Sequence, residues 1–226
     1  MERKYYEAYD DRYRQIHSLN LQWFYDHPTP VVLETIKEFG INRDHSILEL
    51  GCGEGRDAII LLKDGYSLLA TDISSAAIEF SRKKWPEFAE KFAVLDCVAG
   101  DLPKKFDFIY AVAVVHMLVD DVDRDRFFAF IREHLTPGGV ALVCTMGDGE
   151  TERETDTRTA FDLQKRTHEQ SGREVRIAST SCRMVTFATL HKELQRSGLE
   201  VIKEGITSAM PDFTEMMYVV VRGSLR

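Results

Sequence analysis

Apolar and polar segments alternate regularly along the chain from Ser46 onward. SILEL (46–50) is a short apolar run that predicts a buried strand, and RDAIILLKDG (56–65) has helical spacing with a glycine beyond its end. Strands and helices continue to alternate through YSLLATD (66–72), SSAAIEFSRKKW (74–85), FAVLD (92–96), FDFIYAVA (106–113), VDRDRFFAFIREHL (122–135) and VALVCTM (140–146), with Ser74 or Ser75 as a helix cap and TPGG (136–139) as a turn. This order predicts a parallel sheet covered on both faces by helices.

The regular pattern stops at Met146. Residues 147–185 are polar, weakly patterned and longer than an ordinary connection, and we interpret them as an insert that caps a substrate site. The chain then predicts a helix (186–198), a strand (199–205), a turn at MPDF (210–213) and a last strand (214–224). Upstream, residues 5–39 favour helices interrupted near His27-Pro28-Thr29-Pro30, and we expect residues 1–40 to form a helical lid.

Length and composition favour a single domain that spans residues 1–226. The chain is 44% hydrophobic and 29% charged, and its net charge of −8 argues against nucleic acid as a partner. No apolar run approaches the roughly 20 residues of a membrane span, and the N-terminus lacks the apolar core of a signal peptide. The four cysteines are far apart, without metal-ligand spacing. We therefore expect a cytoplasmic protein with reduced thiols, no metal and no membrane partner, as a monomer or homodimer.

Gly51, Gly53 and Gly55 stand between the first predicted strand and the helix that follows it. Glycine adopts positive φ angles and lets a ligand approach the backbone closely. The helix N-terminus behind these glycines offers free N–H groups and a partial positive charge. In open α/β sheets, ligands bind at this carboxyl end of the strands, so the loop predicts a cofactor site.

The residues around the glycines indicate which cofactor fits. Arg56 stands where the dinucleotide fingerprint has its third glycine, and no Gly-Lys-Ser/Thr of a P-loop is present. Glu49 would repel a pyrophosphate but would suit an ammonium group. Asp72 ends the next strand, where an acid accepts the two hydroxyls of an adenosine ribose. A ligand with a ribose and a cationic amino group but no phosphate fits both acids, and S-adenosylmethionine is such a ligand.

Several motifs in this order resemble those of the class I S-adenosylmethionine-dependent methyltransferases. LELGCGEGRDA (48–58) is similar to their first motif, TDIS (71–74) to the strand-two motif, and FDFIYA (106–111) to the strand-four motif, with Asp96 ten residues before it. AVVHML (113–118) and LTPGGV (135–140) continue the resemblance, which covers residues 46–144 closely. It implies a Rossmann-like, doubly wound sheet of seven strands, mostly parallel with an antiparallel last strand, and helices on both faces.

The resemblance also implies roles for individual residues. The methionine part of the cofactor would lie against the glycine loop and the end of strand four, the ribose against the acid at the end of strand two, and the adenine against the residues after strands two and three. The implied cofactor-binding residues are Glu49, Gly51, Cys52, Gly53, Gly55, Arg56, Asp72, Ile73, Ser74, Asp96, Cys97, Ala111 and Val112. For Arg56, contact with the cofactor carboxylate and a solvated position both remain open.

Methyl transfer from a sulfonium is an in-line displacement that depends mainly on positioning. His116 is the best-placed candidate for a general base, and packing or cofactor contact is its alternative role. Substrate-binding residues are expected outside the common core: Tyr9, Tyr13, His17 and Trp23 in an aromatic lid, with Met146 and Phe213. The Asn/Asp-Pro-Pro-aromatic motif that marks base or glutamine methylation is absent after strand four, which favours a small-molecule methyl acceptor.

Two other functions are compatible with the same fold. A non-catalytic module could bind S-adenosylmethionine and act as a regulator or scaffold. A nicotinamide-dependent oxidoreductase would keep the fold and change the ligand, but Glu49 and Arg56 argue against it. The preferred hypothesis is an S-adenosylmethionine-dependent methyltransferase.

Overall fold

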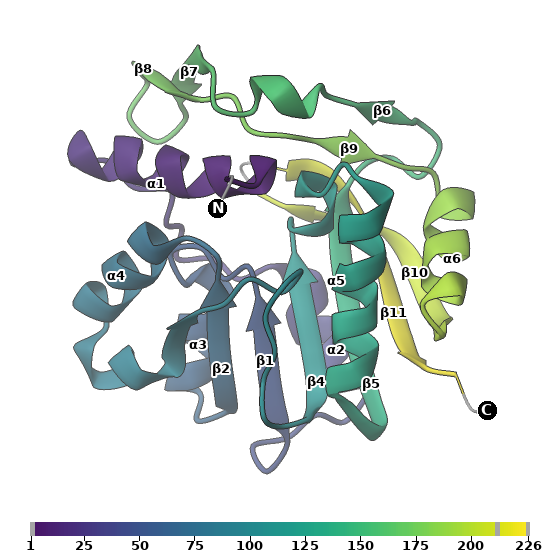
Figure 1. The fold of residues 1–226 in the computed structure, drawn as a ribbon. Coiled ribbons are helices and arrows are strands. Elements are labelled where there is room, and N and C mark those ends of the chain that lie inside the picture. The colour runs from purple at the N-terminus through teal and green to yellow at the C-terminus, as the bar shows by residue number, and fades with distance from the viewer. Residues whose placement is uncertain (1–2, 211–212, 225–226) are drawn as a thin grey trace.

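The computed structural model describes residues 3–210 and 213–224, which contain a seven-stranded sheet (Figure 1). The strands lie in the order β10-β11-β5-β4-β1-β2-β3. Their bounds are β1 (Ser46–Leu50), β2 (Ser67–Asp72), β3 (Phe92–Val94), β4 (Phe106–Val112), β5 (Leu135–Met146), β10 (Leu199–Ala209) and β11 (Phe213–Gly223). The helices are α1 (Ala8–Ser18), α2 (Pro30–Glu38), α3 (Arg56–Lys63), α4 (Ser75–Lys84), α5 (Asp121–His134) and α6 (Phe187–Arg196).

The sheet is mostly parallel, with a reversed strand near its C-terminal edge. β3, β2, β1, β4 and β5 pair in parallel, whereas β11 runs antiparallel to both β5 and β10. Two hydrophobic cores cover its faces, one formed with α5 and α6 and the other with α2, α3 and α4. The predicted Rossmann-like fold, with seven strands and helices on both faces, is confirmed.

Local signals in the sequence explain several helix ends. The side chain of Ser74 accepts a hydrogen bond from the amide of Ala77, so Ser74 caps α4 as one of the two predicted candidates. Pro30 is the first residue of α2, where its missing N–H costs nothing. Gly65 follows α3 with a φ of 84°, a left-handed conformation that commonly ends helices.

Two local predictions differ from the structure. TPGG is not a separate turn, because β5 already begins at Leu135, which pairs with Phe106. Val140 pairs next, with Phe108, so the extra residues of TPGG form an irregularity within the strand. The interruption of the N-terminal helical region is also longer than predicted, since residues 19–29 are outside α1 and α2. In the predicted MPDF turn, residues 211 and 212 lie outside the described residues.

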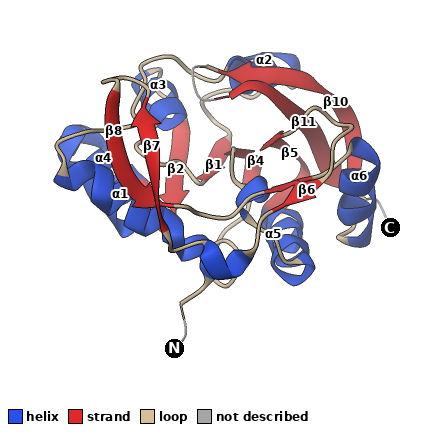
Figure 2. Ribbon diagram, turned by 90° about the horizontal axis from the view of Figure 1, so that it is seen from above, coloured by secondary structure: helices blue, strands red, loops and turns tan. Residues whose placement is uncertain are grey.

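The insert forms two small antiparallel ribbons rather than a helix. One ribbon pairs β6 (Arg153–Glu154) with β9 (Arg183–Met184), and the other pairs β7 (Leu163–His168) with β8 (Arg173–Ala178). Short 3₁₀ helices are η1 (Tyr5–Glu7), η2 (Pro86–Lys91), η3 (Val115–Met117) and η4 (Thr157–Thr159). The insert and α1 lie together above the carboxyl ends of the parallel strands, as both views show (Figures 1 and 2).

Small apolar clusters join the N-terminal segment to the insert. Val175 and Ile177 of β8 pack on Ile16 of α1, and a second cluster joins Ala8 to Ala178. These clusters are separate from the two cores of the sheet. In the part of the chain that the structure describes, no helix has the length and apolar character needed to cross a membrane.

Candidate active site

The glycine loop has the strained backbone that its sequence predicts. Gly51, Gly53 and Gly55 have φ angles of 72°, 53° and 82°, in the left-handed region. A Cβ atom on Gly51 would lie 2.3 Å from the side chain of Val114, and one on Gly53 would lie 2.4 Å from the hydroxyl of Tyr13. Side chains therefore do not fit at these two positions, and the loop presents bare backbone to the space above the sheet.

Two buried groups beside the loop have unused hydrogen-bonding capacity. Glu49 is only 3% exposed, and its Oε2 atom has no hydrogen-bond partner among the described residues. Burial, reinforced by the charge of Asp57, raises the pKa of Glu49 well above its usual range. The side chain of Arg56 is 18% exposed; its Nη2 donates to Thr29 Oγ1 at 2.8 Å, whereas its Nε is buried without a partner. A solvated position for Arg56 is therefore wrong, because most of its side chain is enclosed.

Asp72 lies opposite the loop at the end of β2. Its two carboxylate oxygens accept hydrogen bonds from the amides of Gly53 at 2.7 Å and Ser74 at 2.8 Å. Each oxygen can accept a second hydrogen bond, so the carboxylate can also receive hydroxyl donors from a ligand. Burial raises the pKa of Asp72 to about 6, although the two amides favour the charged form.

The region after β3 contains the second predicted acid, Asp96. One of its oxygens accepts from the amide of Val98 at 2.8 Å, and the other accepts from the hydroxyl of Tyr6 at 3.2 Å. Cys97 lies beside it, and burial raises the pKa of its thiol to about 12. A thiol with this pKa is neutral and unreactive at physiological pH.

His116 lies in η3, just after β4, and its ring is 2% exposed. Its Nδ1 is buried without a partner among the described residues, and the ring lies edge-on to Phe213 at 5.7 Å. Burial, with the positive charges of Arg124 and Arg12, lowers the pKa of His116 to about 3. The imidazole is therefore neutral at physiological pH and only weakly basic.

Arg124 fixes the loop that carries His116. Its guanidinium is fully buried and donates to the carbonyl oxygens of Val115 at 2.8 Å and Leu118 at 3.2 Å. It also pairs with both carboxylate oxygens of Glu193 in α6, at 2.8 and 2.7 Å. A bidentate pair of this kind has defined geometry, so the loop after β4 is held rigidly against the α5–α6 face.

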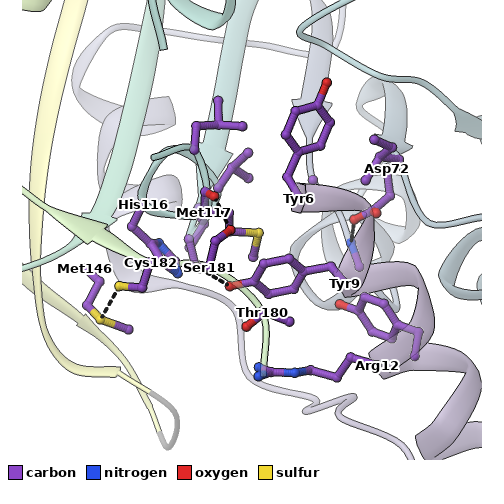
Figure 3. Close-up of a pocket in the computed structure, with 18 of the residues that line it drawn as sticks. Tyr6, Tyr9, Arg12, Asp72, His116, Met117, Met146, Thr180, Ser181 and Cys182 are labelled. Carbon is purple, nitrogen blue, oxygen red and sulfur yellow. Dashed lines mark hydrogen bonds between the residues drawn. The ribbon is translucent and has the colours of Figure 1, made fainter. Parts of the chain in front are cut away.

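The glycine loop, Asp72, Asp96 and His116 surround a cavity of about 550 Å³. It lies between the ends of the strands on one side and α1 and the insert on the other. In Figure 3, Tyr9 and Arg12 of α1 extend toward Ser181 and Thr180 of the insert, with His116 nearby. The predicted site residues that line the cavity are Tyr9, Tyr13, Trp23, Glu49, Gly51, Cys52, Gly53, Arg56, Asp72, Ile73, Asp96, Cys97, Val112, His116, Met146 and Phe213.

Four predicted site residues are outside this lining. Gly55 begins α3, and a Cβ there would touch the ring of Phe92 at 3.0 Å. Ser74 caps α4, and Ala111 of β4 is fully buried in the core. His17 is not in the lining, but its Nε2 is 2.8 Å from Oε1 of Glu54, which is, and its ring stacks on Phe80.

The sequence interpretation missed several lining residues, among them Arg12 of α1. Its spacing of three residues from Tyr9 indicates that it shares a helix face with the predicted aromatic lid. The insert contributes Arg153, Thr155, Thr159, Gln164, Arg166, Ser179, Thr180, Ser181 and Cys182. No signal in the sequence identifies these, because their positions depend on how the two ribbons fold over the sheet.

The chemistry of the cavity floor fits S-adenosylmethionine. The orphaned Oε2 of Glu49 is an acceptor for an ammonium group, and the orphaned Nε of Arg56 is a donor for a carboxylate. Asp72 retains acceptor capacity for ribose hydroxyls beside the backbone of Gly53. Among the described residues, no group of three or more His, Cys, Asp and Glu side chains could hold a metal ion.

Comparison with known proteins agrees with this geometry. A family model described as a methyltransferase domain matches residues 25–204. The chain is 32% identical over 106 residues to hemagglutinin 1 of Eikenella corrodens, and 29% identical over 102 residues to the probable S-adenosyl-L-methionine-dependent methyltransferase TehB of Haemophilus influenzae. These alignments cover 45% and 43% of this chain and 34% of each relative, so the chain spans about a third of the length of these curated relatives.

Solved structures share the fold over nearly the whole chain. The CcbJ methyltransferase from Streptomyces caelestis superposes with a TM-score of 0.67 at 18% identity, over 96% of this chain and 99% of that one. At this identity the likeness concerns the fold alone. The family model covers most of the chain, including the glycine loop, Asp72, Asp96 and His116. The chain therefore belongs to the methyltransferase domain family.

Proposed function

We propose that this protein transfers a methyl group from S-adenosylmethionine to a nucleophile on a small-molecule acceptor bound beneath the lid. The observation that carries the proposal is a single cavity that joins the cofactor groups of the sheet to side chains of α1 and the insert. The methyl donor and the methyl acceptor must lie in one continuous space for the transfer to occur. TehB of Haemophilus influenzae, which is named as a probable S-adenosyl-L-methionine-dependent methyltransferase, supports the same chemistry.

The proposed cofactor contacts follow from the polarity of the floor. Glu49 would accept from the ammonium group, Arg56 would donate to the carboxylate, and Asp72 would accept from the ribose hydroxyls. Ile73 and Cys97 would flank the adenine, and Asp96 would accept from its amino group. Asp96 already accepts from Tyr6, so the hydroxyl of Tyr6 and the adenine amino group would share this carboxylate.

The reaction needs positioning more than acid–base chemistry. When bound, S-adenosylmethionine supplies the methyl group: a bond forms between the acceptor nucleophile and the methyl carbon while the carbon–sulfur bond breaks, and sulfur keeps the electron pair. Holding the acceptor in line can lower the barrier by several kcal/mol, up to about 7–11 in favourable cases. α1 and the insert would limit the access of water to the reacting groups.

His116 fits a positioning role better than that of a strong base. Its depressed pKa of about 3 keeps the ring neutral, so it can accept a hydrogen bond from the acceptor. The same pKa makes it a poor proton acceptor, because a general base works best with a pKa near the working pH. We propose that His116 orients the nucleophile.

A small-molecule acceptor agrees with the cavity of about 550 Å³ and with the net charge of −8. The glycopeptide N-methyltransferase MtfA has the same fold at 23% identity, with a TM-score of 0.64 over 90% of this chain and 97% of that one. The nicotinamide alternative is disfavoured, because the buried carboxylate of Glu49 lies where a pyrophosphate would approach the glycine loop.

Calorimetric titration with S-adenosylmethionine tests the proposal, with NAD and the Asp72→Ala variant as controls. We expect micromolar binding by the wild-type protein, about −8 kcal/mol, and its loss in the variant. A screen that detects S-adenosylhomocysteine formation then distinguishes an enzyme from a non-catalytic module. Absence of binding to both S-adenosylmethionine and S-adenosylhomocysteine would overturn the proposal.

A further inference from the structure

Charges in the cavity are separated between its two walls. The acids that line it are Glu49, Glu54, Asp57, Asp72 and Asp96, and they belong to the strand ends and loops of the sheet and to the first turn of α3. The lid wall contributes three cations, Arg12 from α1 and Arg153 and Arg166 from the insert. Among the described lining residues, the insert contributes no acid, although residues 147–185 contain several Asp and Glu side chains.

Arg12 is the most enclosed of these cations. Its guanidinium donates to the carbonyl oxygens of Ala178 at 3.1 and 3.0 Å and Ser179 at 2.8 Å, and it lies 5.4 Å from the ring of Tyr9 and 5.9 Å from that of Trp23. Among the described residues, no carboxylate lies within 4 Å of it. An enclosed charge that pairs only with neutral dipoles is costly and favours an anion from outside the chain.

Arg166 adds a second positive charge close to the first. Burial and the neighbouring Arg166 both lower the pKa of Arg12, which indicates that the two guanidinium groups repel one another. Arg166 forms an ion pair with Glu169 at 3.6 Å, in which both side chains are exposed, at 44% and 39%. Arg153 lines the same wall and has no ion pair within the described part of the chain. A bound anion would relieve this repulsion.

This wall is separate from the groups that fit the carboxylate of the cofactor. Arg56 is part of the glycine-loop wall and is anchored to Thr29. Arg12 is anchored instead to the insert, through the carbonyl oxygens of residues 178 and 179. One cavity therefore holds two cationic sites on opposite walls, and the cofactor would occupy only the one with Arg56.

We propose that the acceptor is a small molecule that carries a carboxylate, and that Arg12 and Arg166 bind this carboxylate while the nucleophile faces the glycine loop. The inference rests on the proposed function, since it assigns the acceptor class of the same site. A guanidinium matches the planar shape of a carboxylate. Tyr9 and Trp23 would contact the apolar body of the acceptor beside this anion subsite.

Matched pairs of probes that differ only in charge test the proposal. The protein is first saturated with S-adenosylhomocysteine. Calorimetry then measures the binding of two acid–amide pairs: 3-phenylpropionate with 3-phenylpropanamide, and hexanoate with hexanamide. In the wild-type protein we expect the acid of at least one pair to bind tenfold or more tightly than its amide. Arg166→Gln should reduce this preference severalfold, and Arg12→Gln combined with Arg166→Gln should remove it.

Arg176→Gln is the matched control, because it removes a positive charge from the neighbouring strand β8 without altering the cavity lining. This control should keep the wild-type preference. Arg166 is on an exposed ribbon, so its single variant remains informative even where Arg12→Gln fails to fold. The inference would be overturned if the wild-type protein bound acid and amide equally or did not bind the acids. It would also be overturned if the preference for the acid survived both substitutions. Failure to bind S-adenosylhomocysteine would instead contradict the proposed function.

Discussion

The hydroxyl of Tyr13 lies directly above Gly53, 2.4 Å from where a Cβ atom on this glycine would be. The two residues are forty positions apart, in the lid helix and in the cofactor loop. Their contact bounds the cavity at this point and connects α1 to the glycine loop. Space and backbone conformation both explain why Gly53 is a glycine.

Gly53→Ala should destabilise the protein through two separate effects. The left-handed backbone costs a non-glycine residue about 1–2 kcal/mol, and the clash with Tyr13 adds a further penalty. In a Tyr13→Phe background the clash should fall while the backbone cost remains. Denaturant unfolding of the two single variants and the double variant measures this coupling.

Gly138→Ala provides a control with the same kind of backbone and no steric contact. Gly138 has a φ of 89°, and a Cβ there would meet no atom within 4 Å. The loss of unfolding free energy in Gly138→Ala should therefore equal the backbone contribution to the loss in Gly53→Ala, without the contribution of the clash. If Gly53→Ala and Gly138→Ala are equally destabilising, the contact with Tyr13 has no energetic weight.

Asp72 should make cofactor binding depend on pH. Its pKa of about 6 in the ligand-free protein lies above the usual value of 3.8, and hydroxyl donors of a bound ribose would favour the charged form. Affinity for S-adenosylmethionine should then fall up to tenfold per pH unit below about pH 6 and level off above it. Calorimetry between pH 5 and 8 measures the profile. Asp72→Asn should bind S-adenosylmethionine weakly, and its affinity should depend less on pH. If the pH dependence of the affinity is unchanged in this variant, another group is responsible for the titration.

His116 should contribute to acid unfolding. Its folded pKa of about 3 lies below the usual 6.5, so the unfolded chain takes up the proton first. The stability that the neutral ring contributes is complete above pH 6.5 and is lost as the pH falls toward 3, by about 1.4 kcal/mol per pH unit. In His116→Gln the unfolding free energy should fall less steeply over this range. Identical slopes in both proteins would contradict the depressed pKa.

The fold of the sheet was predictable because its signals are local. SILEL, the glycines after it and Asp72 are consecutive in the chain, and a parallel sheet brings the ends of its strands to one edge without further information. The hairpin of the insert also had a signal: apolar Val175 and Ile177 alternate with charged residues after Gly172. The surrounding polar stretch hid this alternation.

The part of the site formed by α1 and the insert could not be predicted from local signals in the sequence. Arg12 meets the insert only because the insert folds back onto α1, and its hydrogen bonds to Ala178 and Ser179 span more than 150 residues of sequence. His17 shows the opposite error, because its pattern suggested a lid residue whereas Glu54 and Phe80 hold it outside the cavity. Helical spacing predicts a shared face, but the partner of that face depends on tertiary packing.

Arg124 and Glu193 should be strongly coupled in stability. Both are buried, and removing one partner leaves the other charge without compensation. Arg124→Met should lower the unfolding free energy by about 3–5 kcal/mol, and Glu193→Leu by a similar amount. The double variant should recover much of this loss, since no charge remains buried. Additive losses in denaturant unfolding would show that packing, and not the ion pair, dominates.

Arg222→Met is a suitable control for this pair. Arg222 forms an ion pair with Glu200 at 3.0 Å, but both side chains are about half exposed. Exposed pairs contribute little, typically below 1 kcal/mol. A large effect at this surface pair would indicate that arginine removal destabilises the protein for reasons other than burial.

Deletion of residues 1–25 should weaken cofactor binding more than it weakens the fold. α1 contacts the insert, the glycine loop and the N-terminus of α4: Ile16 packs on β8, Tyr13 covers the glycine loop, and Asp10 accepts from the Ser74 hydroxyl at 2.8 Å. The two cores of the sheet receive little from this segment beyond Tyr6. Calorimetry with S-adenosylmethionine measures the loss of binding free energy, and denaturant unfolding measures the loss of stability. Ser18→Ala is the control, because among the described residues the exposed Ser18 hydroxyl bonds only the carbonyl oxygen of Gln15 in the same helix. Equal losses would mean that α1 is part of the structural core and not a lid.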